Sequence, residues 1–267
     1  MAAMRDLLND IAASGKDPVA VSQQAMKPAL PRRFYKEAKA APGEAGHGVF
    51  LDGRPVRTPG RRLLELPTLA AASQVAGEFA AQGEFIDPAD MPATRLANTT
   101  IDGIVPDMQP VLEDISRFAA SDLLCYRAAT PRELVARQGE LWDPVIDWLR
   151  DELGANFVLA EGIVHVSQPR EAMALFAARL RAHAEPFRLA CLHTVTSLTG
   201  SAFLALAVAE DRIDAQEAWT AGNLDEDWNS ALWGEDAEAA HRRADRWRQM
   251  AAACNLLASL PKPARPA

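Results

Sequence analysis

The segment from Gly48 to Leu66 constrains the fold most strongly, because it alternates short apolar runs with two tight-turn dipeptides. Asp52-Gly53 follows the apolar run 49–51 and supplies residue types that tolerate the positive φ angles of a two-residue hairpin turn. A second turn is expected at Pro59-Gly60, where proline sets one φ angle and glycine supplies the positive φ of the next residue. These residues predict short antiparallel strands.

A helix is expected to cover this small sheet. Thr68 suits the N-cap position, and apolar residues recur at helical spacing from Leu69 to Phe79. A further strand is expected near Phe34-Tyr35, before Gly and Pro residues interrupt the pattern. We therefore predict an N-terminal extension over residues 1–30 and a small α+β domain with antiparallel strands over residues 31–110.

The pattern changes beyond residue 110, where apolar residues recur at helical spacing. Two clear examples are Leu112–Leu123 and Trp142–Leu153. The chain is 49% apolar but only 6% aromatic, so Ala and Leu supply much of the apolar content. Both residues lose little side-chain entropy in a helix and therefore favour it. We predict an all-helical C-terminal domain over residues 111–260 and a tail over residues 261–267, so the fold class is α+β.

Three finer predictions concern this helical part. The stretch Leu189–Ala209 is long enough to cross a bilayer, but its His, Thr and Ser residues favour a buried helix of a soluble protein. Asp214 and Glu217 match a capping box, which marks the start of a helix. The last helix is expected to begin at Glu235, with one face formed by small and apolar residues from Ala240 to Cys254.

Composition argues against some classes of partner. The net charge is −8 at pH 7, whereas nucleic-acid binding needs Lys and Arg gathered on one surface. Residues 1–30 balance acids with bases and lack a continuous apolar core, so no secretory signal is expected. We expect a protein that binds no nucleic acid, does not insert into a membrane and is a monomer when free. The bacterial cytoplasm is the expected location, with the mitochondrial matrix as the alternative.

The sequence lacks the patterns that are typical of catalytic and metal sites. The three cysteines are widely spaced, which indicates neither a disulfide framework nor a zinc site. The five histidines form no H-E-x-x-H pattern, and no G-x-G-x-x-G loop occurs. Two carboxylate pairs could in principle serve as acid and base, namely Asp122 with Glu113 and Asp143 with Asp147. Because the sequence indicates no cleft that would shift their pKa values, we assign no catalytic, metal-binding or cofactor-binding residues.

The segment from residue 225 to residue 238 stands apart, because it holds six acids and no Lys or Arg. The acids are Asp225, Glu226, Asp227, Glu235, Asp236 and Glu238. On one continuous helix Trp228 and Trp233 would lie about 140° apart, so a narrow core stripe could not bury both rings. One ring faces outward, or Gly234 ends the helix. The segment is then either a recognition surface with an aromatic anchor, or a solvated acidic face with both rings in the core.

Basic residues are also clustered in two places. Arg54, Arg57, Arg61 and Arg62 lie on the hairpin, where they would meet an acidic partner or keep an exposed strand from pairing with another sheet. A second group follows the acidic segment and is interpreted as ordinary helix-surface bases: Arg242, Arg243, Arg246 and Arg248.

A set of short segments runs through the chain in a characteristic order. In the first half they are Arg33–Lys36, Leu51–Pro59, Gln82–Ile86, Met91–Pro92 and Thr94–Asn98. In the second half they are Ser121–Arg127, Trp142–Pro144, Leu224–Trp228 and Trp233–Gly234. Together these segments resemble the ATP synthase assembly chaperones of the ATP-twelve type, which attend the alpha subunit of the catalytic head. The chain departs from that pattern at Phe79, where Trp is usual, and at Ala93, where a larger apolar residue is usual.

The resemblance implies a fold and a function. It implies a small N-terminal α+β domain, a helical C-terminal domain, no catalytic residues, no cofactor and a state bound to the alpha subunit. It also implies that an acid among Asp225, Glu226 and Asp227 matters for chaperone action, which favours the recognition surface. We therefore predict partner binding by these three acids together with Trp228 and Trp233. Two alternatives remain open: a hydrolase or transferase with an interdomain site, and a scaffold for an unrelated client.

Overall fold

The computed structural model describes residues 30–162, 165–234 and 237–263. The predicted extension, apart from residue 30, lies outside the described residues, as do Glu235, Asp236 and the last four residues of the predicted tail. The described chain groups into two compact units, one of residues 30–34 with 82–87 and one of residues 35–81 with 88–263. The predicted domain boundary at residue 110 stays a prediction.

The smaller unit consists of two extended segments joined by backbone hydrogen bonds. The amide of Arg33 donates to the carbonyl of Glu84, and the amide of Ile86 donates to the carbonyl of Pro31, both at 2.9 Å. Arg32 forms a bridge with Phe85, and its guanidinium lies 5.9 Å from the centre of that ring. These contacts hold the two segments together without a helix.

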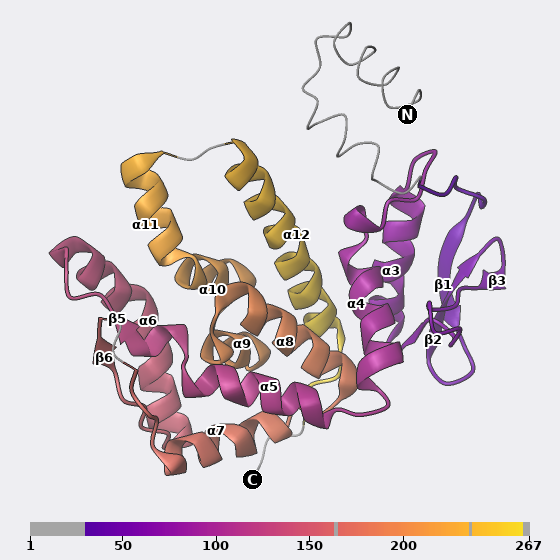
Figure 1. Cartoon of the computed structure of the whole chain (residues 1–267). Coiled ribbons are helices and arrows are strands. Elements are labelled where there is room, and N and C mark those ends of the chain that lie inside the picture. The colour runs from indigo at the N-terminus through magenta and orange to yellow at the C-terminus, as the bar shows by residue number, and fades with distance from the viewer. Residues whose placement is uncertain (1–29, 163–164, 235–236, 264–267) are drawn as a thin grey trace, which may run out of the picture. The chain divides into compact units, whose positions relative to one another are not determined.

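The larger unit begins with a four-stranded antiparallel sheet in which β2 pairs with every other strand (Figure 1). The strands are β1 (Ala38–Pro42), β2 (His47–Leu51), β3 (Arg54–Pro55) and β4 (Glu65–Leu66). Asp52 and Gly53 have φ angles of 47° and 77°, so the predicted hairpin turn is confirmed. The first strand begins at Ala38 rather than near Phe34-Tyr35. Tyr35 is instead a core residue, whose hydroxyl donates to the carbonyl of Phe79 at 2.8 Å.

The turn at Pro59-Gly60 is present, but glycine is needed at residue 60 for a different reason from the one predicted. The positive φ, 64°, belongs to Arg61 and not to Gly60. A Cβ atom on Gly60 would lie 2.5 Å from Oδ1 of Asp102, whose other carboxylate oxygen, Oδ2, accepts a hydrogen bond from the Gly60 amide at 2.8 Å. The glycine therefore allows a close approach between the turn and a distant carboxylate.

Helix α3 (Leu69–Ala81) covers the sheet, and α4 (Pro92–Thr99) lies beside it (Figure 1). The hydroxyl of Thr68 accepts a hydrogen bond from the Ala71 amide at 3.1 Å, which confirms the predicted N-cap. The carboxylate of Glu78 on α3 accepts from the amides of Ala93 and Thr94, each at 2.7 Å, and so caps α4. The 3₁₀ turn η1 (Pro88–Asp90) precedes α4, and the π-helical turn η2 (Thr100–Ile104) follows it.

The rest of the chain is mostly helical, as predicted, and this confirms the α+β class. The helices are α5 (Gln109–Ala120), α6 (Arg132–Leu153), α7 (Arg170–Arg181), α8 (Pro186–Thr199), α9 (Ala202–Ala209), α10 (Ala215–Gly222), α11 (Leu224–Trp233) and α12 (Ala237–Ser259). A 3₁₀ turn, η3 (Leu123–Cys125), follows α5, and β5 (Tyr126–Arg127) pairs in parallel with β6 (Ala160–Glu161). The capping box of Asp214 and Glu217 is confirmed at the start of α10.

The stretch predicted as one buried helix over Leu189–Ala209 is buried but forms the two helices α8 and α9. Gly200 ends α8 in the left-handed conformation with φ 71°, and the Ser201 hydroxyl accepts from the Leu204 amide to cap α9. The fully buried Asp122 supports this break, because it accepts from the Ser201 hydroxyl at 2.7 Å and from the Phe203 amide at 3.1 Å. In the part of the chain that the structure describes, no helix is both long and apolar enough to span a bilayer.

Helix α12 packs against α8, and also against α3 and α4. The side chain of Gln74 on α3 donates to the carbonyl of Ala252 at 2.9 Å. The residues of α12 that are buried begin at Met250, whereas Ala240 and Ala244 are exposed. The face predicted from Ala240 to Cys254 is therefore buried only in its second half, and the first half of α12 lies at the surface near α10 and α11.

Candidate functional site

Helix α11 contains all five residues predicted to bind a partner. Gly234 ends it with φ 86°, which is one of the two alternatives left open by the spacing of the tryptophans. Of the ten residues of α11 only Leu224, at its start, is buried. Figure 1 shows α11 and the first half of α12 both rising above α10. The helix is therefore held with little apolar packing of its own.

The three acids in the first turn of α11 are all in contact with other helices. Asp227 forms an ion pair with Arg243 of α12 at 2.5 Å, and Glu226 forms one with Arg246 at 3.2 Å. Asp225 accepts a hydrogen bond from the side-chain amide of Gln138, on α6, at 3.0 Å. Negative charge in a first turn is also favoured by the helix dipole. These acids thus contribute to the position of α11 itself.

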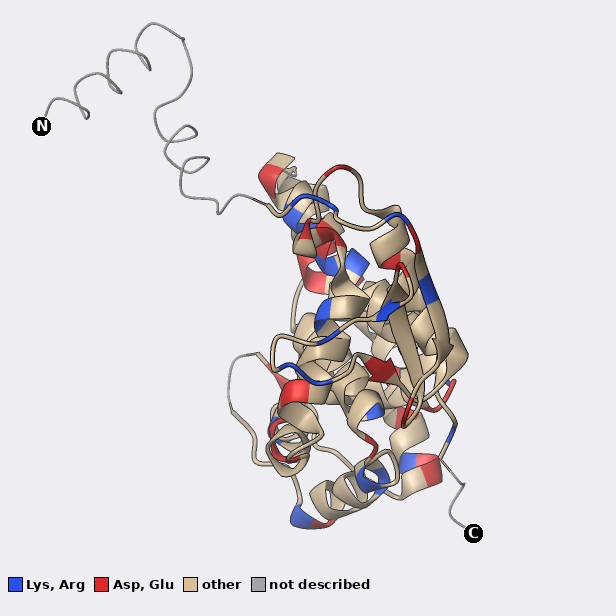
Figure 2. Ribbon diagram, turned by 90° about the vertical axis from the view of Figure 1, so that its right-hand side faces the viewer, with Lys and Arg blue, Asp and Glu red and all other residues tan. Residues whose placement is uncertain are grey.

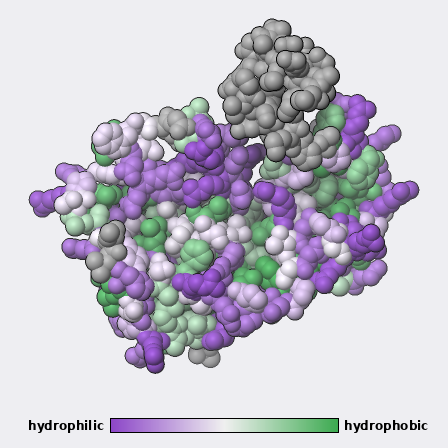
Figure 3. Space-filling model, in the orientation of Figure 1, coloured by the Kyte–Doolittle hydropathy of each residue, from purple (hydrophilic) through white to green (hydrophobic). Residues whose placement is uncertain are grey.

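The arginines that meet these acids are ordered by Trp219 of α10. The guanidinium carbons of Arg243 and Arg246 each lie 5.6 Å from the centre of a Trp219 ring, and Trp219 meets Trp247 edge to face at 5.5 Å. A pocket of about 440 Å³ lies beside these rings, with Asp227 also in its wall. The surface over the first half of α12 is mainly hydrophilic (Figure 3).

The two tryptophans of the segment differ in exposure. Trp233 is 85% exposed and its neighbour Leu232 is 61% exposed, whereas Trp228 is half-buried. The interpretation with both rings in the core is therefore wrong for Trp233. Leu232 and Trp233 therefore form a small exposed apolar patch at the end of the helix.

Helix α6 positions α11 through two residues one turn apart. The indole N–H of the buried Trp142 donates to the carbonyl of Ala221 at 2.9 Å, close to the end of α10. The buried Gln138 accepts from the amide of Ala128 at 2.8 Å while its own amide donates to Asp225. Sequence reasoning missed Gln138. It also took Arg243 and Arg246 for ordinary surface bases, although their position just after an acidic segment was a signal of pairing.

Gly222 ends α10 two residues before α11 begins, at a close contact with α8. A Cβ atom there would lie 2.6 Å from the Cβ and 2.9 Å from the Cα of Thr199. We expect Gly222→Ala to lower the free energy of unfolding by about 2 kcal/mol, because backbone would have to move. Denaturant unfolding measures this. Gly77→Ala is the control, since nothing lies within 4 Å of that added Cβ and alanine favours helix. Equal stability of the two variants would contradict the prediction.

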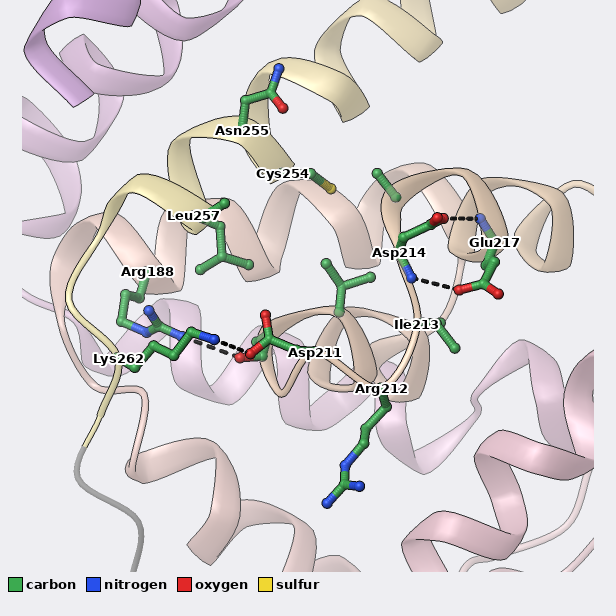
Figure 4. A pocket seen from close by; sticks show the side chains of 14 residues that line it. Arg188, Asp211, Arg212, Ile213, Asp214, Glu217, Cys254, Asn255, Leu257 and Lys262 are labelled. Carbon is green, nitrogen blue, oxygen red and sulfur yellow. Dashed lines mark hydrogen bonds and ion pairs between the residues drawn. The ribbon is translucent and has the colours of Figure 1, made fainter. Parts of the chain in front are cut away.

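A second pocket, of about 420 Å³, lies between α8, the turn after α9 and the second half of α12 (Figure 4). Its charged groups are engaged in the fold. Asp214 and Glu217 cap α10, and Asp211 pairs with Lys262. Buried Arg188 donates to the carbonyl of Pro261 at 3.0 Å. The polar residues that line this pocket therefore stabilise the fold.

The carboxylate pairs considered for acid and base roles are also engaged. Asp143 pairs with Arg127 at 2.7 Å, and Asp147 pairs with Arg150 at 2.8 Å. Asp122 is a buried cap, and burial raises its pKa to about 7 against the lowering effect of its hydrogen bonds. Among the described residues, no three His, Cys, Asp or Glu side chains are grouped so that they could hold a metal ion.

The basic group on the hairpin is partly structural. Arg57 donates to the carbonyl of Arg61 at 2.8 Å, and Arg62 donates to the carbonyl of Ile101 at 2.6 Å. Acidic and basic residues are interspersed over the face shown in Figure 2. Two of the four hairpin arginines thus stabilise the local fold, whereas the choice between an acidic partner and protection of a strand edge stays a prediction.

Comparison with known proteins identifies the family. The family model for the ATP12 chaperone protein matches residues 32–150. The crystal structure of Atu1473, a candidate chaperone from Agrobacterium tumefaciens, is 52% identical and has a TM-score of 0.84, with 97% of each chain covered.

Two further structures are of Atp12 from Paracoccus denitrificans, one of them a variant with an aspartate replaced by lysine. Each is 38% identical to this chain with a TM-score of 0.78, and the match covers 85% of this chain and 97% of the other. The matches extend well beyond the part recognised by the family model. This chain therefore belongs to the ATP12 chaperone family and is a chaperone rather than an enzyme.

Proposed function

We propose that this protein binds the unassembled alpha subunit of the F-type ATP synthase catalytic head and keeps it soluble until it pairs with beta. Family membership supports the chaperone role, and the resemblance described in the sequence analysis supplies the client. The observation that carries the proposal is the exposed apolar end of α11, Leu232 and Trp233. Contiguous exposed apolar residues rimmed by polar ones are a feature of protein-binding surfaces.

Binding of the client is proposed to depend on Asp225, Glu226, Asp227, Trp228 and Trp233. Trp233 is the proposed anchor, because burial of an indole in a partner's pocket contributes more to binding than most other side chains. Leu232 extends the same apolar end.

The affinity of the complex must be limited. A protein that binds an unassembled state too tightly opposes assembly by mass action, so the alpha subunit has to leave when beta is present. We therefore expect an interface of standard size, on the order of 1,600 Å² in total, with one or two anchors. The proposal involves a free monomer in the bacterial cytoplasm, or in the mitochondrial matrix. It requires no nucleic acid, membrane insertion or cofactor.

Changing both Leu232 and Trp233 to serine is expected to weaken binding of the alpha subunit at least tenfold, because the anchor and its neighbour are removed. Binding is measured with purified protein and isolated alpha subunit by titration calorimetry, in the absence of beta. Thermal unfolding should change little, since both side chains are exposed.

A matched control changes Val158 and Leu159 to serine. These two adjacent apolar residues are 41% and 43% exposed but lie next to β6 and not on α11. This control should bind the alpha subunit as the unchanged protein does. If both double variants bind equally well, α11 is not the binding element. If the unchanged protein binds no alpha subunit, the client is another protein and the scaffold alternative is favoured.

A further inference from the structure

We infer that the three acids at the start of α11 act within the chaperone, through Gln138, Arg243 and Arg246, and not by touching the client. These three partners are positioning residues that hold α11 so that its apolar end faces outward. The inference rests on the proposed function for the identity of the client, but the arrangement of α11 can be tested without it.

The packing of α11 requires such contacts. An isolated helix of this length is marginal in water, and tertiary contacts must hold it in one place. Leu224 is buried and Trp228 is half-buried, so the apolar packing of this helix is confined to its first half. The polar links of its first turn have to set its direction.

The geometry of the first turn gives links to two different helices. Successive residues of an α-helix point about 100° apart, so three consecutive side chains span a wide arc. Asp225 reaches α6, whereas Glu226 and Asp227 reach α12. Contacts on two sides restrain rotation as well as tilt, which a single ion pair would not do.

The partners on α12 are fixed independently of α11. Both arginines stack on Trp219, and Arg246 also donates to the carbonyl of Leu198, on α8, at 2.7 Å. Their guanidinium groups are therefore held before the acids meet them. A preorganised cation loses less side-chain entropy when it binds a carboxylate, so these pairs are more effective than those between mobile surface residues.

The contact with Gln138 on α6 depends strictly on a hydrogen-bond acceptor at residue 225. The side-chain amide of Gln138 is buried, with its oxygen taken by the Ala128 amide and its nitrogen directed to Asp225. Without an acceptor at residue 225, the nitrogen of this buried amide would lose its hydrogen bond. A lysine at this position would offer a donor to a donor. All three acids therefore favour the same placement of α11.

Charge reversal separates action within the chaperone from direct contact with the client. We expect Asp227→Arg alone and Arg243→Asp alone each to weaken alpha-subunit binding about tenfold, because like charges then face each other. The double variant restores an ion pair in reversed order and should bind within about threefold of the unchanged protein. If Asp227 touches the client directly, the double variant stays as weak as Asp227→Arg, and the inference is overturned.

Hydrogen exchange of the α11 amides provides a readout that does not depend on the client. Exchange should be faster in each single variant and return toward the original rate in the double variant. Unchanged exchange in the single variants would overturn the inference even if the alpha subunit binds. If no alpha subunit binds to the unchanged protein, the proposed function fails, while the exchange rates still decide the role of the acids.

The matched control is the pair Glu238 and Arg242, 2.6 Å apart and four residues apart on α12. Like Asp227, Glu238 lies in the first turn of its helix, so its reversal has the same effect on a helix dipole. Reversing either member of this pair should leave binding and α11 exchange unchanged. Loss of binding with this control would show a general charge effect and overturn the inference. Should Asp227→Arg fail to fold, Asp227→Asn tests the same contact with a smaller effect.

Discussion

Replacing Trp142 by alanine is expected to lower the free energy of unfolding by about 4 kcal/mol. The indole is fully buried, lies 5.3 Å from the guanidinium of Arg127 and donates to the carbonyl of Ala221 at 2.9 Å. Alanine removes the ring, leaves a cavity and leaves that carbonyl without its donor. Urea unfolding followed by far-UV circular dichroism measures the loss.

Trp142→Phe separates the two contributions. Phenylalanine keeps most of the apolar ring but has no N–H, so the expected loss is roughly 2 kcal/mol, from a smaller ring and an unpaired carbonyl. If the alanine variant is no less stable than the phenylalanine variant, burial of the ring is not the main contribution. The outcome matters for the site, because Trp142 fixes the end of α10 from which α11 continues.

Replacing Asp122 by asparagine should change how stability depends on pH. Burial raises the pKa of Asp122 from 3.8 to about 7, although hydrogen bonds from Ser201, Phe203 and Leu124 act to lower it. Between these values the folded protein keeps the proton while the unfolded chain releases it. The folded state therefore binds more protons, and the contribution of Asp122 to stability falls as pH rises from about 4 to 7.

The comparison of the two proteins isolates this group, because all other titrating residues are shared. The stability of the unchanged protein relative to Asp122→Asn should fall by up to roughly 4 kcal/mol between pH 4 and pH 8. Denaturant unfolding at four pH values across this range gives the difference curve. A flat curve would show that Asp122 has the same charge in the folded and unfolded states. A rising curve would show a lowered pKa and an ionised carboxylate that caps α9.

The elements that the sequence predicted well depend on short-range physics. The hairpin at Asp52-Gly53 requires positive φ angles within two residues, and the capping box of Asp214 and Glu217 spans four. Thr68 is an N-cap for the same reason, since its hydroxyl bonds to an amide three residues away. Neighbouring residues decide each of these features, so the pattern is visible without a fold.

The features that the sequence missed depend on residues far apart in the chain. Gly60 is needed because Asp102 approaches it, and the break at Gly200 is supported by Asp122. In neither case does the local pattern name the distant carboxylate. Tyr35 was expected in a strand, but its contact with Phe79 makes it a core residue. Tertiary packing overrides local preference at such positions.

In the candidate site, too, the sequence predicted what neighbouring residues decide and missed what distant residues decide. The sequence marked the segment by its clustered acids and two tryptophans, and the spacing of Trp228 and Trp233 showed that one narrow stripe could not bury both. The sequence did not reveal which ring is exposed, because that depends on where α11 ends and on what lies beside it. It also did not reveal that Asp225 meets Gln138, since 87 residues separate them.

By itself, then, the sequence of this protein determined the α+β class, the main turns and caps, the family and the segment that we propose binds the client. Periodicity, turn chemistry and ordered motifs are all properties of the chain read in one direction. Only the tertiary structure decided that α11 is held by a side-chain amide on α6 and by two arginines on α12, and that Trp233 remains exposed. Burial and ion pairing depend on which surfaces meet in space, and local sequence patterns do not specify that.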